Sequence, residues 1–462
     1  MRLIRWFYPG LRIKRWLLAL VLAAAVFALA IVLIVGPRYW DLERIALTGV
    51  YYATGRFVPL AITGVVVAAL AAAAAIFAVR QVVMSIVQAV SPPSADGLGE
   101  ALYLQRQRGR GPRVVAIGGG TGLSTLLRGL KEYTTNITAI VTVADDGGSS
   151  GRLRGELGIL PPGDLRNCLA ALAETEPLMA EVFQHRFERG SLAGHTVGNV
   201  LIGALDEITG DFVAAVSAAS RVLAVRGPVL PATTDEVRLA ARLEDGREVH
   251  GESAITAAGG RIAELRLLPE GARALPEACE AVAAADLIVI GPGSLYTSIL
   301  PNLLLPELAA AVRAARGPRL FVVNMMTQPG ETGGFSAADH LAALRALAGP
   351  GLVDAVVVNT APVSAARAAP YRLQGAAPVR VDRAALEGMG VHVVTGDLAA
   401  AEGLVRHDPE RLAAMLLHEY LRRAGPPEPN RVVDHYLLAD RIRRAVPRAH
   451  GARGAETSRA GT

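Results

Sequence analysis

The sequence predicts an α/β fold, with a doubly wound and mainly parallel sheet that carries a small β-rich insertion. An apolar, β-branched run at 114–117 is followed by glycines and a helical segment. A second apolar run at 286–290 also ends in a glycine turn. Further apolar runs at 320–323, 353–358 and 391–394 continue the alternation of strand and helix patterns, which is typical of a parallel sheet.

The first 90 residues predict a membrane hairpin in front of this fold. The stretches Trp16–Pro37 and Phe57–Val79 contain no charged residue, and each exceeds the roughly 20 residues that cross a bilayer as a helix. We therefore expect two transmembrane helices, the alanine-rich second one being less secure than the first. A cleaved signal peptide is the competing interpretation, but the first apolar run is long and a second one follows it.

Charge around these stretches predicts the orientation. Five basic residues and no acid precede the first stretch, which by the positive-inside rule holds the N-terminus in the cytoplasm: Arg2, Arg5, Arg12, Lys14 and Arg15. Two spans return the chain to that side, so we expect a two-pass protein of the inner membrane with loop 38–56 outside and the soluble domain in the cytoplasm. The net charge is +5 and the pI about 9.4, but aromatic residues make up only 5%. This favours membrane lipids over nucleic acid as the anionic partner.

Segments 91–112 and 425–462 are predicted to flank the soluble domain, 113–424. The first contains Pro92, Pro93 and several arginines and is typical of a linker. The second is rich in Arg, Pro and Gly, and we expect it to be largely disordered. Two cysteines, Cys168 and Cys279, are too few for a disulfide framework or a zinc ribbon.

The first glycine turn is typical of a phosphate site. It reads Gly118, Gly119, Gly120, Thr121, Gly122 between the strand and a helix expected at 124–131. Free N–H groups at a helix start attract an anion, and glycine lets a pyrophosphate approach. A Walker loop is disfavoured because no lysine follows the glycines directly. The dinucleotide fingerprint matches only in part, because Leu123 stands at its third glycine, which weighs against a dehydrogenase. A tight turn without a ligand is the structural alternative.

Other candidate residues follow the expected strands. Asp145 and Asp146 end a strand at 137–143, where a ribose or a metal could be held, and Asp164 is placed to cap a helix at 165–173. His195 and Asn199 lie at the start of a helix at 200–208. A hairpin around Glu244, Asp245 and Gly246 marks the β-rich insertion, about 228–270. A second glycine turn, 291–294, follows the strand at 286–290 and suggests a two-sided cleft.

Four motifs together resemble the YvcK proteins, the gluconeogenesis factors, within the CofD-like family of 2-phospho-L-lactate transferases. They are GGGTGLS at 118–124, TVADDGGSSGRLR at 142–154, PPGDLRN at 161–167 and GPGSLYTS at 291–298. The likeness covers about 113–421, and the front of the chain departs from the usual pattern. The resemblance implies a Rossmann-like domain that binds UDP-N-acetylglucosamine or UDP-glucose.

The resemblance also implies a role and a set of ligand residues. The role is a regulator that links gluconeogenic growth to cell-wall synthesis and cell shape through a cell-wall protein, with no reaction required. The alternative is a phospho-group transferase with Mg²⁺ held by Asp145 or Asp146. A homo-oligomer is compatible with either role. The implied ligand residues are Gly118, Gly119, Gly120, Thr121, Gly122, Asp145, Asp146, Gly147, Gly148, Ser149, Arg152, Asp164, Arg166, Asn167, His195, Asn199, Gly291, Pro292, Gly293, Ser294, Tyr296, Asn324 and Thr327.

Overall fold

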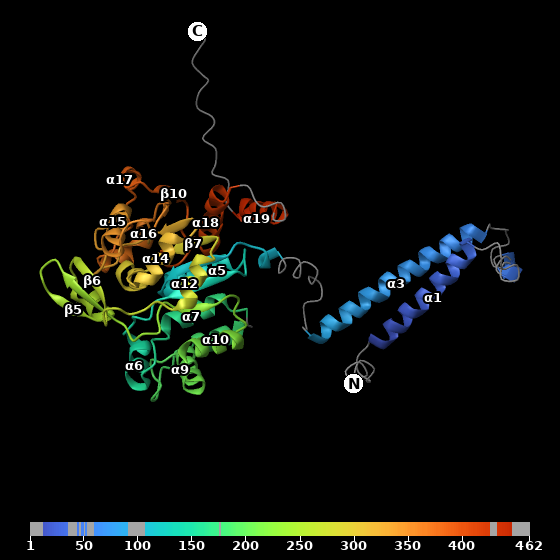
Figure 1. Cartoon of the computed structure of the whole chain (residues 1–462), viewed down its shortest axis with the longest axis horizontal. Helices are drawn as coiled ribbons and strands as arrows, with labels where there is room; N and C mark the ends of the chain where they lie inside the picture. The colour runs from blue at the N-terminus through green and yellow to red at the C-terminus, as the bar shows by residue number, and fades with distance from the viewer. Residues whose placement is uncertain are drawn as a thin grey trace, which may run out of the picture. The chain divides into compact units, whose positions relative to one another are not determined.

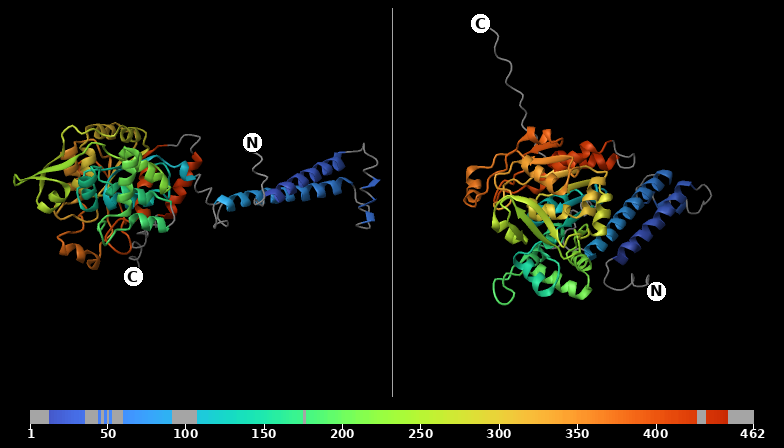
Figure 2. Two further views of the ribbon diagram at one scale, coloured as in Figure 1. Left: turned by 90° about the horizontal axis from the view of Figure 1, so that it is seen from below. Right: turned by 60° about the vertical axis from the view of Figure 1, so that its left-hand side comes forward.

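The structure is a computed structural model that describes residues 13–35, 44–45, 48–49, 51–52, 60–90, 107–174, 177–425 and 432–445. These fall into two compact units, Met1–Leu104 and Gln105–Thr462 (Figures 1 and 2). Four predicted segments lie wholly or partly outside the described residues. They are the linker from 91 to 106, the basic residues Arg2, Arg5 and Arg12, most of the loop 38–56, and the tail beyond 445.

The first unit contains two helices that pack side by side, α1 (Ile13–Val35) and α3 (Leu60–Val90). The Trp16 ring meets the Phe77 ring edge-on at 5.5 Å between centroids. Gly64 lets the helices approach, because a Cβ there would lie 2.7 Å from Ile34 Cγ1. Among the described residues one helical stretch, Ile62–Val82, is long and apolar enough to cross a membrane, while the apolar part of α1, Leu18–Ile31, falls short.

The expectation of two transmembrane helices is therefore not supported as it stands, because only one stretch of the described residues meets both criteria. The alanines in α3 do not shorten its apolar stretch. A bent pair, Leu295–Leu303 and Pro306–Ala314, has a similar composition, but its first part is buried in the second unit.

The second unit is built on a seven-stranded sheet of order β10-β9-β8-β7-β1-β2-β3. Every neighbouring pair is parallel, which confirms the α/β prediction. All residues of β1 and β7 are buried, so both faces of the central sheet are covered. The strands are β1 Val114–Gly118, β2 Ile137–Val141, β3 Val229–Pro231, β7 Leu287–Ile290, β8 Arg319–Val322, β9 Ala355–Asn359 and β10 His392–Gly396.

Helices connect these strands and pack on the sheet (Figure 1). They are α5 Gly120–Leu130, α6 Gly148–Leu157, α7 Gly163–Leu172, α8 Pro177–Gln184, α9 Val197–Thr209, α10 Phe212–Val222, α12 Pro276–Ala283, the π-helix η3 Leu295–Ile299, α13 Leu300–Leu303, α14 Pro306–Ala314, α15 Ala337–Ala348, α16 Ala365–Leu373, α17 Arg383–Gly388 and α18 Pro409–Arg423.

The insertion is a separate three-stranded antiparallel sheet of order β5-β4-β6. It contains β4 (Arg238–Leu243), β5 (Glu248–His250), α11 (Glu252–Ala258) and β6 (Ile262–Leu268), with the expected turn between β4 and β5. Its start lies later than the predicted residue 228, because β3 pairs with β2 in the main sheet.

Several helix starts differ from the prediction. Helix α5 begins at Gly120 rather than at residue 124, so the last glycines form its first turn. Asp164 lies inside the first turn of α7, which begins at Gly163, and does not cap it. Thr196 caps α9: its hydroxyl accepts the Asn199 N–H at 3.3 Å. The C-terminal segment contains helix α19 (Val432–Ala445), packed on α18, where largely disordered chain was expected.

The strand order reverses at β1. The chain goes from β1 to β2 and β3 on one side, then returns to β7, which pairs with β1 on its other side and leads to β8, β9 and β10. In open α/β sheets, ligands bind outside the carboxyl ends of the strands at such a reversal. The fold therefore points to the segments that follow β1 and β7.

Candidate functional site

The two glycine turns meet at this reversal. A Cβ on Gly122 would lie 2.5 Å from the carbonyl oxygen of Pro292, so only glycine permits this approach. Asn324, which follows β8, fixes the second turn. Its Oδ1 accepts the Gly293 N–H at 3.1 Å and its Nδ2 donates to the Gly293 carbonyl at 2.8 Å. The two turns expected to form a cleft thus lie side by side.

A cleft of about 290 Å³ opens along the turns. Gln328 lines it and steadies the second turn, because its Nε2 donates to Ser294 Oγ at 2.6 Å. The predicted residues in its walls are Gly119, Gly120, Thr121, Gly122, Pro292, Gly293, Ser294 and Asn324. Residues that the sequence did not predict are Thr125, Ser298, Met325, Met326, Gln328, Tyr371, Val405, Arg406 and His407.

One wall of the cleft joins α16 to the segment before α18. The Val405 N–H donates to the hydroxyl of Tyr371 at 3.0 Å, which ties this partly buried ring to residues 405–407. Arg406 is exposed at the cleft. Burial lowers the pKa of Arg128 on α5, and the positive charge of Arg406 lowers it further. Two cations that repel one another beside a glycine turn favour an anionic ligand.

Three carboxyl groups gather beside the first turn. Burial, followed by the charges of Asp145 and Asp164, raises the pKa of Glu252 to about 9. Burial and Asp145 raise the pKa of Asp164 to about 7, although the Gly120 N–H donates to this carboxylate. Burial also raises the pKa of Asp145, whose Oδ1 accepts the Gly147 N–H at 2.8 Å. A cation would relieve this accumulation of negative charge.

Asp146 and Glu331 connect the site to the insertion instead. Asp146 Oδ1 accepts the Ser253 N–H at the start of α11 at 2.9 Å. The buried Glu331 accepts from Thr297 of η3 and Thr256 of α11, each at 3.3 Å. Within the part of the chain that the structure describes, no three His, Cys, Asp or Glu side chains are arranged to hold a metal ion. Two carboxylates would hold Mg²⁺ only together with phosphate oxygens or water.

A buried polar network lies beside the cleft. Asn199 Nδ2 donates to Ser149 Oγ at 2.9 Å, and Ser149 Oγ lies 3.0 Å from His195 Nδ1. The serine hydroxyl can donate to Nδ1, with the imidazole proton on Nε2, or accept from an N–H at Nδ1, depending on the tautomer. Burial, then the charge of Arg152, lowers the pKa of His195 and keeps it neutral.

Arg166 and Arg152 brace this network through α9 and its preceding loop. Arg166 donates to Thr196 Oγ1 at 2.6 Å and to Asn167 Oδ1 at 2.7 Å. Arg152 donates to the carbonyl of Ala193 at 2.9 Å. Ser149, Arg152, Arg166, Asn167, His195 and Asn199 are thus brought together, but outside the cleft walls.

Two predicted residues lie in the core rather than the cleft. Tyr296 is only 2% exposed, because it lies on the π-helix η3 and packs edge-on against Phe335. Burial raises its pKa to about 12. Thr327 is buried, and its hydroxyl accepts the Ala377 N–H at 2.9 Å. The packing interpretation of Tyr296 therefore holds here, and the ring exposed to the cleft is that of Tyr371.

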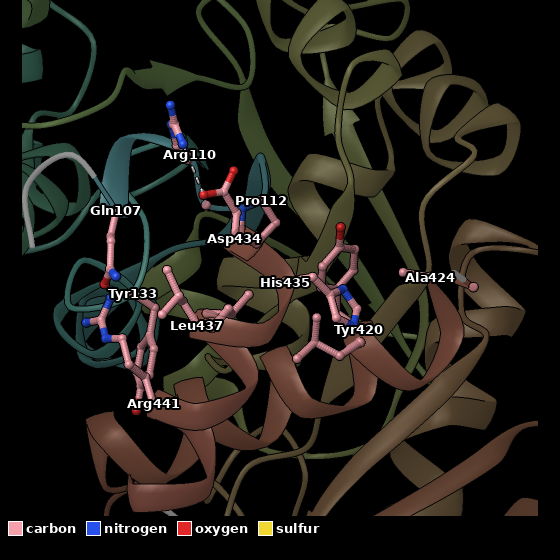
Figure 3. A pocket seen from close by; sticks show the side chains of 14 residues that line it. Gln107, Arg110, Pro112, Tyr133, Tyr420, Ala424, Asp434, His435, Leu437 and Arg441 are labelled. Carbon is pink, nitrogen blue, oxygen red and sulfur yellow. Dashed lines mark hydrogen bonds and ion pairs between the residues drawn. The ribbon is translucent and has the colours of Figure 1, made fainter. Parts of the chain in front are cut away.

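A second cavity, of about 210 Å³, lies at the other end of the strands (Figure 3). It is formed by residues 107–112, which precede β1, together with α18 and α19. Arg110 pairs with Asp434 at 3.4 Å, and the Arg441 guanidinium lies 5.2 Å from the Tyr133 ring centre. It contains no predicted site residue, so the cleft at the glycine turns is the candidate ligand site.

Comparisons with known proteins agree with this geometry. Residues 114–399 match the model of the family described as 2-phospho-L-lactate transferase CofD. The gluconeogenesis factor of Bacillus subtilis is 50% identical over 311 residues, which cover 67% of this chain and 98% of that protein. A protein of a Nostoc species, provisionally named a gluconeogenesis factor, is 48% identical over 422 residues, covering 90% of this chain and 92% of its own.

The longer match extends into the front of the chain, because 422 of 462 residues cannot be aligned without part of the first 90. The front is therefore shared with some relatives. Among solved structures, a UPF0052 family protein of Bacillus halodurans matches with a TM-score of 0.65 and 48% identity, over 66% of this chain and 99% of that one.

Proposed function

The chain belongs to the CofD family and, within it, to the gluconeogenesis factors, and from this premise we propose that it is a regulator that binds a nucleotide-sugar in the cleft at the glycine turns. One observation carries the proposal: the turns after β1 and β7 meet at the reversal of strand order and face Tyr371 and Arg406 across the cleft. UDP-N-acetylglucosamine and UDP-glucose are the ligands we propose.

Each part of such a ligand has a suitable partner. Helix α5 begins at Gly120, whose N–H donates to Asp164, and its N-cap residue Gly119 has no side chain to cap the other N–H groups of the first turn, so these can meet a diphosphate. Arg406 supplies positive charge in the cleft wall, and the charge of Arg128 on α5 lies near it. The partly buried ring of Tyr371 offers a face to the base, and stacking of a base on an aromatic ring contributes about 1–3 kcal/mol.

The alternative is a phospho-group transferase. The raised pKa values around Asp145 support a cation beside the phosphates, and Asp145 with Asp146 would hold Mg²⁺ there. When bound, Mg²⁺ would neutralise charge on a transferring phosphate. We favour the regulator because relatives that this chain matches over 92% and 98% of their own length are named gluconeogenesis factors.

Anchorage at the inner membrane is part of the proposal. Helix α3 contains one stretch that passes the length and apolarity criteria, and α1 packs beside it. We propose that the pair forms a two-pass hairpin which holds the ligand domain in the cytoplasm, near anionic lipids and a cell-wall synthesis protein. Cysteine labelling tests this: a cysteine at Thr48 should react from outside and one at Asp96 only from inside, and the opposite pattern would reject the topology.

Titration calorimetry tests the ligand and the activity together. The full chain, in detergent micelles, is titrated with UDP-N-acetylglucosamine, UDP-glucose, ADP-glucose and NAD, and each mixture is then analysed for products. Saturable binding of a UDP-sugar without turnover supports the regulator. Product that accumulates with time and needs Mg²⁺ supports the transferase, and binding of NAD alone would reject both.

A further inference from the structure

His407 occupies a fixed position in the wall of the cleft. It lies in the segment between β10 and α18, where the backbone of His407 forms an antiparallel bridge with that of Ala399. The next residue, Asp408, donates its N–H to the Leu398 carbonyl at 2.7 Å and caps α18 by accepting the Arg411 N–H at 2.9 Å. The backbone on both sides of His407 is therefore held by hydrogen bonds, and the imidazole is only 7% exposed.

The imidazole Nε2 of His407 is buried and has no hydrogen-bond partner among the residues that the structure describes. Buried polar atoms in proteins are nearly always paired, because water is lost without replacement when they are not. An unpaired nitrogen in the wall of a cleft can be satisfied when a ligand enters. His340 Nε2 is also buried and unpaired, but this imidazole lies outside the cleft and its Nδ1 bonds to the Ser336 carbonyl.

His407 is suited to an uncharged group. Burial alone lowers the pKa of His407 to about 4, so the ring is neutral at pH 7 and adds no positive charge for a phosphate. The neutral imidazole offers either an N–H or a lone pair at Nε2, depending on the tautomer. Arg406 and the amides of the first turn can bind the charged parts of a ligand instead.

We propose that His407 Nε2 hydrogen-bonds the uncharged edge of a pyrimidine base that lies against Tyr371. Tyr371 and His407 belong to the same wall, because the Tyr371 hydroxyl accepts the N–H of Val405, two residues before His407. A uracil edge carries both an N–H and carbonyl oxygens, so it can match either tautomer. This inference rests on the proposed function and names the part of the ligand that His407 contacts.

The test compares binding and stability in variants of the full chain. Calorimetry with UDP and with UDP-N-acetylglucosamine is run on His407→Leu, His407→Gln and the control His340→Leu. Loss of one hydrogen bond should weaken both ligands about tenfold in His407→Leu. The melting temperature without ligand should stay level or rise, since an unpaired polar atom has been removed. Gln carries a polar atom near the position of Nε2 and should retain most of the affinity.

Each other outcome has a distinct meaning. Unchanged affinity in His407→Leu, with wild-type chain that binds, overturns this inference alone. Weaker binding of UDP-N-acetylglucosamine with unchanged binding of UDP also overturns it, because His407 would then read the sugar. If Leu lowers the melting temperature as well as affinity, His407→Gln decides: equal losses in both variants indicate a packing role. A wild-type chain that binds neither ligand rejects the proposed function first.

Discussion

Gly119 has no room for a side chain because the carboxylate of Asp164 occupies that space. A Cβ on Gly119 would collide with Asp164 Oδ2 and lie 2.9 Å from Thr142 Cγ2. Asp164 in turn accepts the N–H of Gly120, the first residue of α5. Gly119 is therefore required by a neighbouring acid. At Gly120 a Cβ would lie 3.8 Å from Ser298 Oγ, an ordinary contact, but its φ of +66° is one that L side chains rarely adopt.

Gly119→Ala should destabilise the domain by displacing Asp164. Overpacking of this kind typically costs about 1–3 kcal/mol, so thermal unfolding should occur at a lower temperature. The double variant Gly119→Ala/Asp164→Ala should recover part of the loss. Gly210→Ala is the control for strain alone, because Gly210 has a φ of +68° and no heavy atom within 4 Å of a built Cβ. Additive losses in the double variant would contradict the coupling between Gly119 and Asp164.

Asp145→Asn should raise stability without ligand and remove any response to Mg²⁺. The substitution takes one negative charge from the group that also contains Asp164 and Glu252, whose pKa values are raised. Melting temperature is measured first without ligand, and then with UDP in the presence of MgCl₂ and in the presence of EDTA. An Mg²⁺ response that is equal in wild type and variant would show that Asp145 holds a hydroxyl group or no ligand.

The architecture was predictable because its signals are local. Buried β-branched runs and the glycine turns after them are read directly from the sequence, and the parallel sheet follows from their alternation with helices. The start of α5 was not predictable, since Gly120, Thr121 and Gly122 disfavour a helix by intrinsic propensity. Gly122 contacts Pro292, which lies more than 160 residues later in the sequence. This contact accompanies the helical conformation of residues 120–122.

The far wall of the cleft could not be predicted from motifs. Tyr371, Arg406 and His407 lie far from both glycine turns in the sequence, and the path of the chain from β10 to α18 brings them there. Conversely, Tyr296 follows a glycine turn, which suggested a ligand role, but the π-helix turns its ring into the core. Spacing along the chain identified the turns and not the side chains that face them.

Stability without ligand should fall as the pH rises from about 5 to 9. Glu252 keeps its proton in the folded state up to a pKa of about 9, whereas the unfolded chain releases it near pH 4.5. Between these values the folded state binds more protons, so raising the pH favours unfolding. Asp164, with a pKa of about 7, adds to the trend in the lower part of this window.

Melting curves of wild type and Glu252→Gln across this range check the sign. The variant should lose much of the slope, since its amide does not titrate. Glu402→Gln, at an exposed position, should retain the wild-type slope. A slope in Glu252→Gln as steep as in wild type would show that other groups cause it.

Tyr371 and Tyr296 should respond in opposite ways to truncation. Tyr371→Ala removes the partly buried ring in the cleft, and stacking of about 1–3 kcal/mol corresponds to a loss of one to two orders of magnitude in affinity for UDP-sugars. Tyr296→Ala removes a ring that is 2% exposed and should cost about 3–5 kcal/mol of stability, with little effect on affinity in the protein that remains folded.

Tyr371→Phe separates the roles of ring and hydroxyl. It keeps the stacking face but leaves the Val405 N–H without its acceptor at 3.0 Å. Affinity near that of wild type would assign the binding to the ring. A loss as large as in Tyr371→Ala would mean that the hydroxyl acts mainly by holding the segment with Val405, Arg406 and His407 in place. If Tyr296→Ala weakens binding and Tyr371→Ala does not, the base lies elsewhere, and the cleft between the glycine turns and Tyr371 is not the ligand site.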